Sequence, residues 1–593
     1  MNGLLNVGDL PSGSARLRAE SRRALAVATM ILVASLAAGC ADEGVDDAAS
    51  DESRRGGTLV VASPADLSVL NVFLASDQWT QEVNRYFLYT PLLRYTPELD
   101  YAPALAESWE ATETSAAFRL RRDVRWHDGR PTTAHDVVYT IETARNPETA
   151  FPNASYFERW TSVEAVDSYT VLVRFEAYPE PLAGLPFTPI MPAHLLEGVA
   201  PGAMRTAEYN QRPVGNGPFR FVSSAPGERW IFEANPAYPE SLGGPPYLDR
   251  VVWLVVPDNT AQTTALRTGE VDLVIGPRAP ELRQLDAEPG IHAIVKPSRL
   301  YAFVAWNGQR PPLDDARVRR ALSLAIDRPE ILTVLRGGYG VLAAGPIAPV
   351  HWAYPEDVRP LPFSPDSARA LLAAAGLTDR NGDGTVERPD GGRLEIEMKY
   401  PAQNPFNADV VEMIRADLAQ VGVRVRPRAT EFGTMIQDVM APARNFDAVS
   451  GLAWETDFNL ATLRDLFHSD ALGSAYQSSS YSNAEVDSLI DRASRTLDRE
   501  QARPMWRRVQ EIMRDEQPWT FLFYYPELFA ARDWLHTTEL DVRGAFADIG
   551  DWWMDPAAHR RTAAGARDSI AAAAPDTAET AARDTADGAA PAP

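Results

Sequence analysis

The 593-residue chain contains a single cysteine, Cys40, and only two lysines, Lys296 and Lys399. One thiol cannot form an internal disulfide, so the stability of the fold must come from core packing. The motifs of common enzymes are also missing: the sequence has no GxSxG elbow, no phosphate-binding P-loop and no HExxH helix. A dispersed catalytic triad would leave no such motif, so a hydrolase is kept as the less favoured alternative.

Positive charge is scarce relative to negative charge. The chain has 57 Lys and Arg against 81 Asp and Glu, which gives a formal net charge of −24. Nucleic-acid binding needs a basic face, so this balance argues against a nucleic-acid partner. After Cys40 no apolar run approaches the ~20 residues of a membrane-spanning helix. The sequence therefore predicts a soluble body with no membrane span of its own.

The lone cysteine follows a pattern that is typical of secretory signals. A basic stretch and an apolar run, residues 24–38, lead through small residues to Cys40. This segment resembles a bacterial lipoprotein signal, in which the cysteine becomes the lipid-bearing first residue. We therefore predict a signal peptide over 1–39, lipidation of Cys40 and a flexible tether over 40–56. A buried or incidental cysteine is the alternative interpretation.

Strand and helix patterns alternate along the middle of the chain. Residues 394–400 alternate apolar and polar side chains, 407–422 follow a helical period, and 423–429 again suit a strand. A strand–helix–strand unit predicts two parallel strands with a right-handed crossover, and hence an α/β fold. Farther on, Ser482 and Glu485 have the spacing of a capping box and predict the start of another helix.

The stretch "DRNGDGTVERPD", residues 379–390, resembles a calcium-binding loop. Its oxygen-bearing residues stand at positions 1, 3, 5, 7, 9 and 12 of such a loop, namely Asp379, Asn381, Asp383, Thr385, Glu387 and Asp390. The last position departs from the pattern, because calcium loops place a bidentate Glu there. A polar turn between a helix and a strand is the alternative. Calcium bound here would be structural, and the sequence indicates no required cofactor.

Several phrases, taken together and in order, resemble the family 5 solute-binding proteins of ABC transporters, which include dipeptide and oligopeptide receptors. They run from "GGTLVVA" through "YTPLLRYTPELDYAPALAESWE", "PVGNGPFRF" and "PPLDDARVRRALSLAIDRPEIL" to "YSNAEVDSLIDRA". The resemblance covers about residues 56–555. It implies a bilobed α/β fold of the periplasmic-binding-protein (Venus flytrap) type, with mixed sheets, a hinge and an inserted subdomain.

The same resemblance implies a division of the chain. Lobe one would comprise residues 57–95, 212–298 and 525–561, with 96–211 inserted as a subdomain, and lobe two would comprise 299–524. The last segment, 562–593, repeats Ala, Asp and Thr and contains no aromatic residue. Such a composition cannot build a core, so we predict a disordered tail.

The resemblance also suggests ligand-binding residues. In peptide-binding members an aspartate that follows a tryptophan pairs with the α-ammonium group of the peptide. The matching stretch here, "AWETDFN", gives Trp454 and Asp457, and the main chain of Ala453 to Glu455 would bind an extended peptide like an added strand. The loop "SDQW" would line the opposite wall with Ser76, Asp77, Gln78 and Trp79. Asn459 and Leu460 stand where the family often has Asp-Pro or Glu-Pro, which loosens the assignment to peptides.

The resulting hypothesis is a receptor that delivers dipeptides or oligopeptides to an ABC permease and ATPase complex by closure of its cleft. It would be a monomer, would lie in the periplasm or at the cell surface, and would be held at a membrane by its lipid. Two alternatives stay open, one within binding proteins and one of another class. The same fold serves oligosaccharides and nickel chelates, and a sensory lipoprotein would act without a permease.

Overall fold

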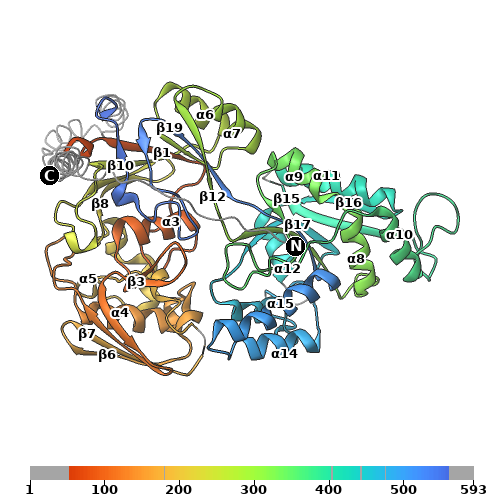
Figure 1. Ribbon diagram of the computed structural model, residues 1–593, viewed down its shortest axis with the longest axis horizontal. Helices are drawn as coiled ribbons and strands as arrows, with labels where there is room; N and C mark the ends of the chain where they lie inside the picture. Colours follow the sequence, from red (N-terminus) through yellow and green to blue (C-terminus); the bar gives the residue numbers. More distant parts are fainter. Residues whose placement is uncertain (1–51, 179, 403–404, 441–443, 475, 560–593) are drawn as a thin grey trace, which may run out of the picture. The chain divides into compact units, whose positions relative to one another are not determined.

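The computed structural model describes residues 52–559, apart from residues 179, 403–404, 441–443 and 475. The predicted signal peptide, residues 40–51 of the predicted tether (including Cys40) and the predicted tail lie outside the described residues. Within the described part, most strands belong to two large sheets and one four-stranded sheet (Figure 1).

The first large sheet has seven strands in the order β12-β19-β11-β1-β10-β9-β8. These strands are β1 (Thr58–Ser63), β8 (Phe219–Ala225), β9 (Arg229–Ala234), β10 (Arg250–Val255), β11 (Leu273–Ile275), β12 (Ile291–Lys296) and β19 (Glu527–Arg532). β1 runs parallel to β10 and β11, whereas the other pairs are antiparallel. Helices α6 (Asn259–Thr268) and α7 (Ala279–Asp286) lie beside this sheet, and Leu266 and Leu282 bury their side chains in a cluster with Val60 (Figure 1).

The second large sheet has six strands in the order β14-β18-β13-β17-β15-β16. They are β13 (Leu300–Trp306), β14 (Val341–Leu342), β15 (Glu395–Pro401), β16 (Arg424–Thr430), β17 (Ala448–Glu455) and β18 (Trp519–Tyr524). Side chains of a strand alternate between the two faces of a sheet. Accordingly, Val304 and Trp306 of β13 pack into one core and Phe303 and Ala305 into another.

Helices cover both faces of this second sheet. Helices α8 (Ala316–Ala325) and α11 (Pro405–Gln420) contribute to the first of these cores, and α14 (Ala484–Ala493) and α15 (Arg499–Glu516) contribute to the second (Figure 1). The predicted strand–helix–strand unit is present, because β15 pairs in parallel with β16 and α11 connects them. The predicted α/β class with mixed sheets is therefore confirmed.

The four-stranded sheet is entirely antiparallel. It contains β4 (Ala106–Ala111), β5 (Ser115–Leu120), β6 (Trp160–Asp167) and β7 (Thr170–Phe175), and α4 (Ala134–Arg145) packs on it through residues such as Val137 and Ile141. All four strands fall within 96–211, the range predicted for the inserted subdomain. The boundaries of the division into lobes stay a prediction.

Two short segments carry the chain between the large sheets. Residues 297–299 join β12 to β13, and residues 525–526 join β18 back to β19. Lys296 and Glu527, which flank these segments, are directly paired in the first sheet. Segments of two or three residues between rigid sheets are suitable hinges, because few backbone torsions need to change.

The predicted capping box at Ser482 and Glu485 is wrong. The cap of α14 is Asn483, whose side-chain oxygen accepts hydrogen bonds from the backbone N–H groups of Glu485 at 2.8 Å and Val486 at 3.2 Å. Ser482 instead places its hydroxyl 2.8 Å from the hydroxyl of Ser469. Asn caps a helix as well as Ser does. Either Ser482 or Asn483 could therefore cap this helix, and the capping-box spacing indicated the wrong one of the two.

Candidate functional site: a charged cavity beside the hinge segments

A cavity of about 400 Å³ lies where the predicted ligand-binding residues converge. Five of the eight predicted residues line it: Ser76, Gln78, Trp454, Glu455 and Asp457. We call it the charged cavity, because four acidic and four basic side chains line it as well as aromatic rings: Glu82, Glu455, Asp457, Glu527, Arg85, Lys296, Arg299 and Arg543. A pocket of this size with a few placed polar groups is suited to a small polar ligand.

The other three predicted residues lie elsewhere. Asp77 is the N-cap of α3 (Gln78–Val83) and accepts a 2.9 Å hydrogen bond from the backbone N–H of Thr80. Trp79 packs against Trp253, with ring centroids 6.0 Å apart. Ala453 lines a different, smaller pocket. None of these three residues lines the charged cavity.

Asp457 lies two residues after the end of β17. Its carboxylate accepts a 3.2 Å hydrogen bond from the hydroxyl of Tyr156 and a 3.0 Å hydrogen bond from the backbone N–H of Asn459. Asp457 is half-buried at the wall of the cavity, and desolvation of its carboxylate raises the pKa of Asp457 above its ordinary value. No cation of the described residues lies within 4.0 Å of it. An incoming ammonium group would therefore find an acceptor whose charge is not yet paired.

One edge of β17 is open next to Asp457. β13 pairs with β17 along Ala448 to Glu455, but β15 on the other side pairs only with Ala448 and Val449. No described strand pairs with the remainder of that edge. Unpaired N–H and C=O groups of a strand edge bind an extended peptide by forming main-chain hydrogen bonds.

The other charges of the cavity are mostly paired with one another. The Lys296 ammonium lies 3.4 Å from Glu527, and the Arg299 guanidinium lies 2.6 Å from Glu455. Arg299 also lies over the ring of Phe458, with its carbon 3.6 Å from the ring centroid. These contacts preorganise the cavity walls at modest cost, because the buried cations Lys296 and Arg299 each have a carboxylate partner.

Glu82, like Asp457, has no described cation within 4.0 Å. It is 5% exposed and accepts a 3.2 Å hydrogen bond from the backbone N–H of Phe546. Burial, together with the negative charge of nearby Glu527, raises the pKa of Glu82, whereas the charges of Lys296 and Arg85 oppose that shift. Part of the charge in the cavity therefore changes with pH near neutrality.

The sequence analysis did not select Glu82, Arg85, Tyr156, Lys296 or Arg299. These residues come from segments far apart in the chain, and no local motif marks them. A signal was available for Lys296. The chain uses Arg for nearly all its positive charge, and its two lysines are both buried beside carboxylates, Lys296 beside Glu527 and Lys399 at 2.7 Å from Asp438. A rare lysine can mark a place where a compact ammonium group fits and a guanidinium does not.

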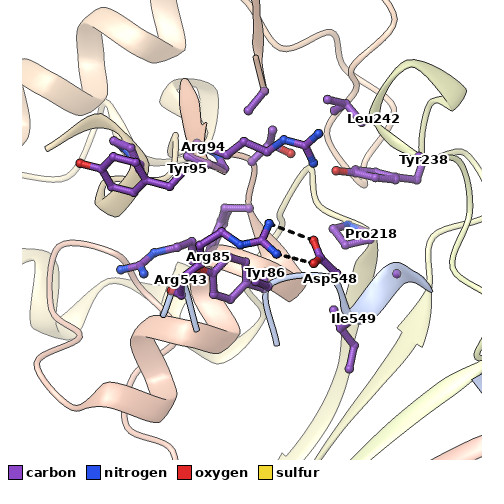
Figure 2. Close-up of a pocket in the computed structure, with 18 of the residues that line it drawn as sticks. Arg85, Tyr86, Arg94, Tyr95, Pro218, Tyr238, Leu242, Arg543, Asp548 and Ile549 are labelled. Carbon is purple, nitrogen blue, oxygen red and sulfur yellow. Dashed lines mark hydrogen bonds and ion pairs between the residues drawn. The ribbon is translucent and has the colours of Figure 1, made fainter. Parts of the chain in front are cut away.

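A second cavity of about 300 Å³ adjoins the first. We call it the tyrosine cavity, because its lining includes Tyr86, Tyr89, Tyr95 and Tyr238. Figure 2 shows Arg94 and Tyr238 on one side of it and the ion pair between Arg543 and Asp548 facing them. Three residues line both cavities: Arg85, Phe187 and Arg543.

The loop at 379–390 forms a closed polar turn. The Asp379 carboxylate accepts hydrogen bonds from the backbone N–H groups of Gly382 at 2.7 Å and Gly384 at 2.9 Å, and Asp383 accepts one from Thr385 at 2.9 Å. Arg393 forms an ion pair with the other oxygen of Asp383. Within the described ranges, no group of three His, Cys, Asp or Glu side chains is arranged to hold a metal ion. Calcium in this loop stays a prediction.

The described residues contain no helix that is both long and apolar enough to cross a bilayer.

Residues 100–470 match the bacterial extracellular solute-binding proteins, family 5, in the middle region of that family. Curated relatives extend the likeness over most of the chain. Oligopeptide-binding protein AppA of Bacillus subtilis is 28% identical over 508 residues, which cover 84% of this chain and 92% of that protein. Heme-binding protein A of Haemophilus influenzae is 29% identical over 70% of this chain and 78% of its own length. The dipeptide-binding protein of Escherichia coli is 27% identical over 78% of this chain and 88% of its own length.

Solved structures agree with the sequence relatives. The structure of AppA from Bacillus subtilis in complex with a nonapeptide matches with a TM-score of 0.72 and 27% identity, over 84% of this chain and 99% of that chain. This likeness confirms the predicted bilobed periplasmic-binding-protein fold.

Proposed function

The chain belongs to the bacterial extracellular solute-binding proteins of family 5, and on this premise we propose that it binds peptides outside the cytoplasm and delivers them to an ABC importer. Two of the relatives described above are named for oligopeptides and dipeptides. The protein would act by binding and release and not by catalysis. The permease and ATPase of the importer would be its partners.

The observation that carries this proposal is the position of Asp457 at the end of an open strand edge. An ammonium group on Asp457 and a peptide main chain along residues 450–455 of β17 would be bound at the same time. A charged hydrogen bond in a site that excludes water is strong, and a strand edge binds any extended main chain regardless of its side chains. Together they recognise what all peptides have in common.

Closure would follow from the hinge segments. Lys296 and Glu527 flank the segments 297–299 and 525–526 and also line the charged cavity. A ligand that contacts both walls favours the closed arrangement, because it binds that arrangement more tightly than the open one. The permease would then recognise the closed form.

We also propose that the protein is a monomer held at a membrane by lipid on Cys40. The lone thiol and its signal-like context support this assignment. Two or more acyl chains are needed for stable anchoring, since one chain alone binds a membrane only marginally.

Mass spectrometry of the intact protein, purified under native conditions from its own host, would test the function. We expect peptides to co-purify. Calorimetry should then show that peptides with a free amino terminus bind and that their N-acetylated forms bind far more weakly. Co-purification of heme, a nickel chelate or an oligosaccharide, with no peptide binding, would replace this proposal by one of those ligands.

A further inference from the structure

A third cavity lies apart from the charged cavity and the tyrosine cavity, and shares no lining residue with either. Its volume is about 290 Å³. We call it the arginine cavity, because Arg159, Arg464 and Arg495 line it and Asp491 is the one acidic residue of its described lining. In a chain whose formal net charge is −24, an excess of positive charge around one cavity points to a bound anion.

Two distant segments of the chain bring the three arginines together. Arg159 directly precedes β6, in the segment predicted as the inserted subdomain. Arg464 belongs to α13 (Leu463–Phe467), and Arg495 lies two residues after the end of α14. Like charges that approach one another around a cavity repel, so this arrangement is unfavourable unless an anion lies between them.

Described residues neutralise only one of the three arginines. Arg464 forms ion pairs at 2.5 Å with both Asp470 and Asp491. For Arg159 and Arg495 no described carboxylate lies within 4.0 Å. The cavity is therefore lined by two cations without a counterion, whereas the charge of its one acidic residue is already compensated.

Ser494 adds a hydrogen-bond donor to this lining. Its buried Oγ has no described hydrogen-bond partner, although the residue lines the cavity. A buried hydroxyl without a partner costs free energy, and a ligand oxygen would remove that cost. Carbonyl groups at the end of α14 would repel an anion, but the carbonyl of Ile490 is already occupied, since it accepts a 2.9 Å hydrogen bond from the N–H of Ser494.

We propose that the arginine cavity binds a small oxyanion of the phosphate class, either free phosphate or a phosphate group on a small solute. Arg159 and Arg495 donate to the anion from opposite segments, and the hydroxyl of Ser494 donates a further hydrogen bond. Guanidinium groups suit this role, because their N–H groups match the spacing of phosphate oxygens and stay charged at any physiological pH. The cavity is several times the ~30 Å³ of one water molecule, so it has room for the anion and a short organic substituent.

The position of the cavity couples it to the peptide site, and this part of the inference rests on the proposed function. Tyr156, which donates the hydrogen bond to Asp457, lies three residues before Arg159. On the other side, Ala461 of the cavity lining lies four residues after Asp457. An anion that joins Arg159 to Arg495 favours the arrangement in which these two segments meet, and so strengthens peptide binding. By linkage, the peptide strengthens anion binding by the same factor.

Calorimetry with inorganic phosphate tests the site without any peptide. The titrations are made at constant ionic strength, with chloride as the balancing anion. We expect one phosphate to bind each wild-type chain, and Arg159→Gln and Arg495→Gln each to weaken that binding at least about tenfold, the loss of a charged hydrogen bond. Glycerol phosphate distinguishes the two sources. Tighter binding than that of phosphate would indicate a phosphorylated solute, and equal or weaker binding would indicate the free anion.

Arg492→Gln is the matched control. Arg492 is exposed on α14 but does not line the cavity, so this variant removes a nearby positive charge and no donor of the site. It should bind phosphate as the wild type does. Equal weakening in all three variants would show that overall positive charge, and not the cavity, attracts phosphate. If phosphate does not bind the wild type at constant ionic strength, the proposal is wrong.

Peptide titrations test the coupling. The probes are alanine peptides of two to five residues with a free amino terminus, titrated with and without saturating phosphate. We expect phosphate to raise peptide affinity in the wild type at least about fivefold, the lower end of allosteric couplings, and to leave it unchanged in Arg495→Gln. If phosphate binds but does not change peptide affinity, the anion site stands and the coupling is wrong. If phosphate binds and no peptide does, the proposed function and the coupling both fail, whereas the anion site stands.

Discussion

The hydroxyl of Tyr156 donates a 3.2 Å hydrogen bond to the carboxylate of Asp457, although the two residues are 301 positions apart. Tyr156 lies between β5 and β6 of the four-stranded sheet, and Asp457 follows β17 of the second large sheet. The contact therefore joins the segment predicted as the inserted subdomain to the segment predicted as lobe two. It also orients the carboxylate without neutralising it, since a phenol brings a hydrogen bond and no charge.

Asp457→Asn should weaken peptide binding by about 2–4 kcal/mol, the range for breaking one side of a desolvated charge pair. Folding should hardly change, because Asn retains an oxygen that accepts the hydrogen bond from the N–H of Asn459. Calorimetry with free and N-acetylated peptides measures the effect. The variant should bind both forms equally weakly. If wild type and variant bind the free peptide alike, Asp457 serves only the local turn.

Lys296→Met should destabilise the protein by about 3 kcal/mol at pH 8, because it leaves Glu527, whose side chain is only 14% exposed, without its cation. The loss of that charge also raises the pKa of Glu82 further. An acid whose pKa is raised in the folded state destabilises the fold when it is ionised and not when it is protonated. The stability difference between the variant and the wild type should therefore shrink as the pH falls from 8 to 5. Thermal melts over this pH range measure it.

Lys399→Met provides a control for the ligand site. This second buried lysine pairs with Asp438, and neither residue lines the charged cavity. It should lower the melting temperature but leave peptide affinity unchanged, whereas Lys296→Met should lower both. Equal peptide affinity in the two variants would remove Lys296 from the ligand-binding site.

Local patterns in the sequence were sufficient for much of the fold. Strict alternation over 394–400 and a helical period over 407–422 are local properties of the chain, and they identified the parallel pair of β15 and β16. The capping error at Ser482 shows the limit of such patterns, since Asn483 offered an equally good cap one residue later. Local patterns locate an element but do not fix its first residue.

The site was predictable only in part, for a physical reason. Trp454 and Asp457 belong to one short motif, whereas Arg85, Tyr156 and Lys296 reach the cavity from three separate segments. The role of each of these residues depends on which polar and charged groups lie next to it in the folded protein. Tertiary packing decides those neighbours, and spacing in the sequence does not. Trp79 shows the opposite error. Its place in the loop at 76–79 suggested a ligand-binding residue, but its ring packs against Trp253.

His351 should make the protein sensitive to acid. It is 3% exposed, its Nδ1 accepts a 3.1 Å hydrogen bond from the N–H of Ala353, and burial lowers its pKa to about 3. The unfolded chain binds a proton at its ordinary value of about 6.5, whereas the folded protein does not. Stability should therefore be lost as the pH falls from 6.5, by about 2 kcal/mol at pH 5 from this group alone.

The variant His351→Asn should show a shallower loss of melting temperature between pH 7 and pH 5 than the wild type. Asn keeps an acceptor for the N–H of Ala353 but cannot take up the proton. His135→Asn is the control, since the His135 side chain is 61% exposed and lies 3.2 Å from Glu197 at the surface. A pH profile of His351→Asn that parallels the wild type would contradict the assignment.

Cys40→Ser should release the protein from the membrane or leave its precursor unprocessed, because only a thiol accepts the lipid. Fractionation of cells that express each form measures the outcome, and labelling with a radioactive fatty acid should mark the wild type alone. Peptide affinity should be the same in both forms, since the charged cavity is built from residues of the folded body. A variant that stays with membranes as the wild type does would disprove lipidation at Cys40.

Asp379→Ala should lower the melting temperature by about 2 °C in the presence of EDTA, because two backbone N–H groups of the loop lose their acceptor. Asp390→Ala should have a smaller effect, since Asp390 accepts only the N–H of Gly392. Neither change should alter peptide affinity. The calcium prediction requires a further result: calcium, but not magnesium, should raise the melting temperature of the wild type by mass action and leave that of Asp379→Ala unchanged. If calcium has no effect on the wild type, the carboxylates of 379–390 serve only to bind the backbone of their own turn.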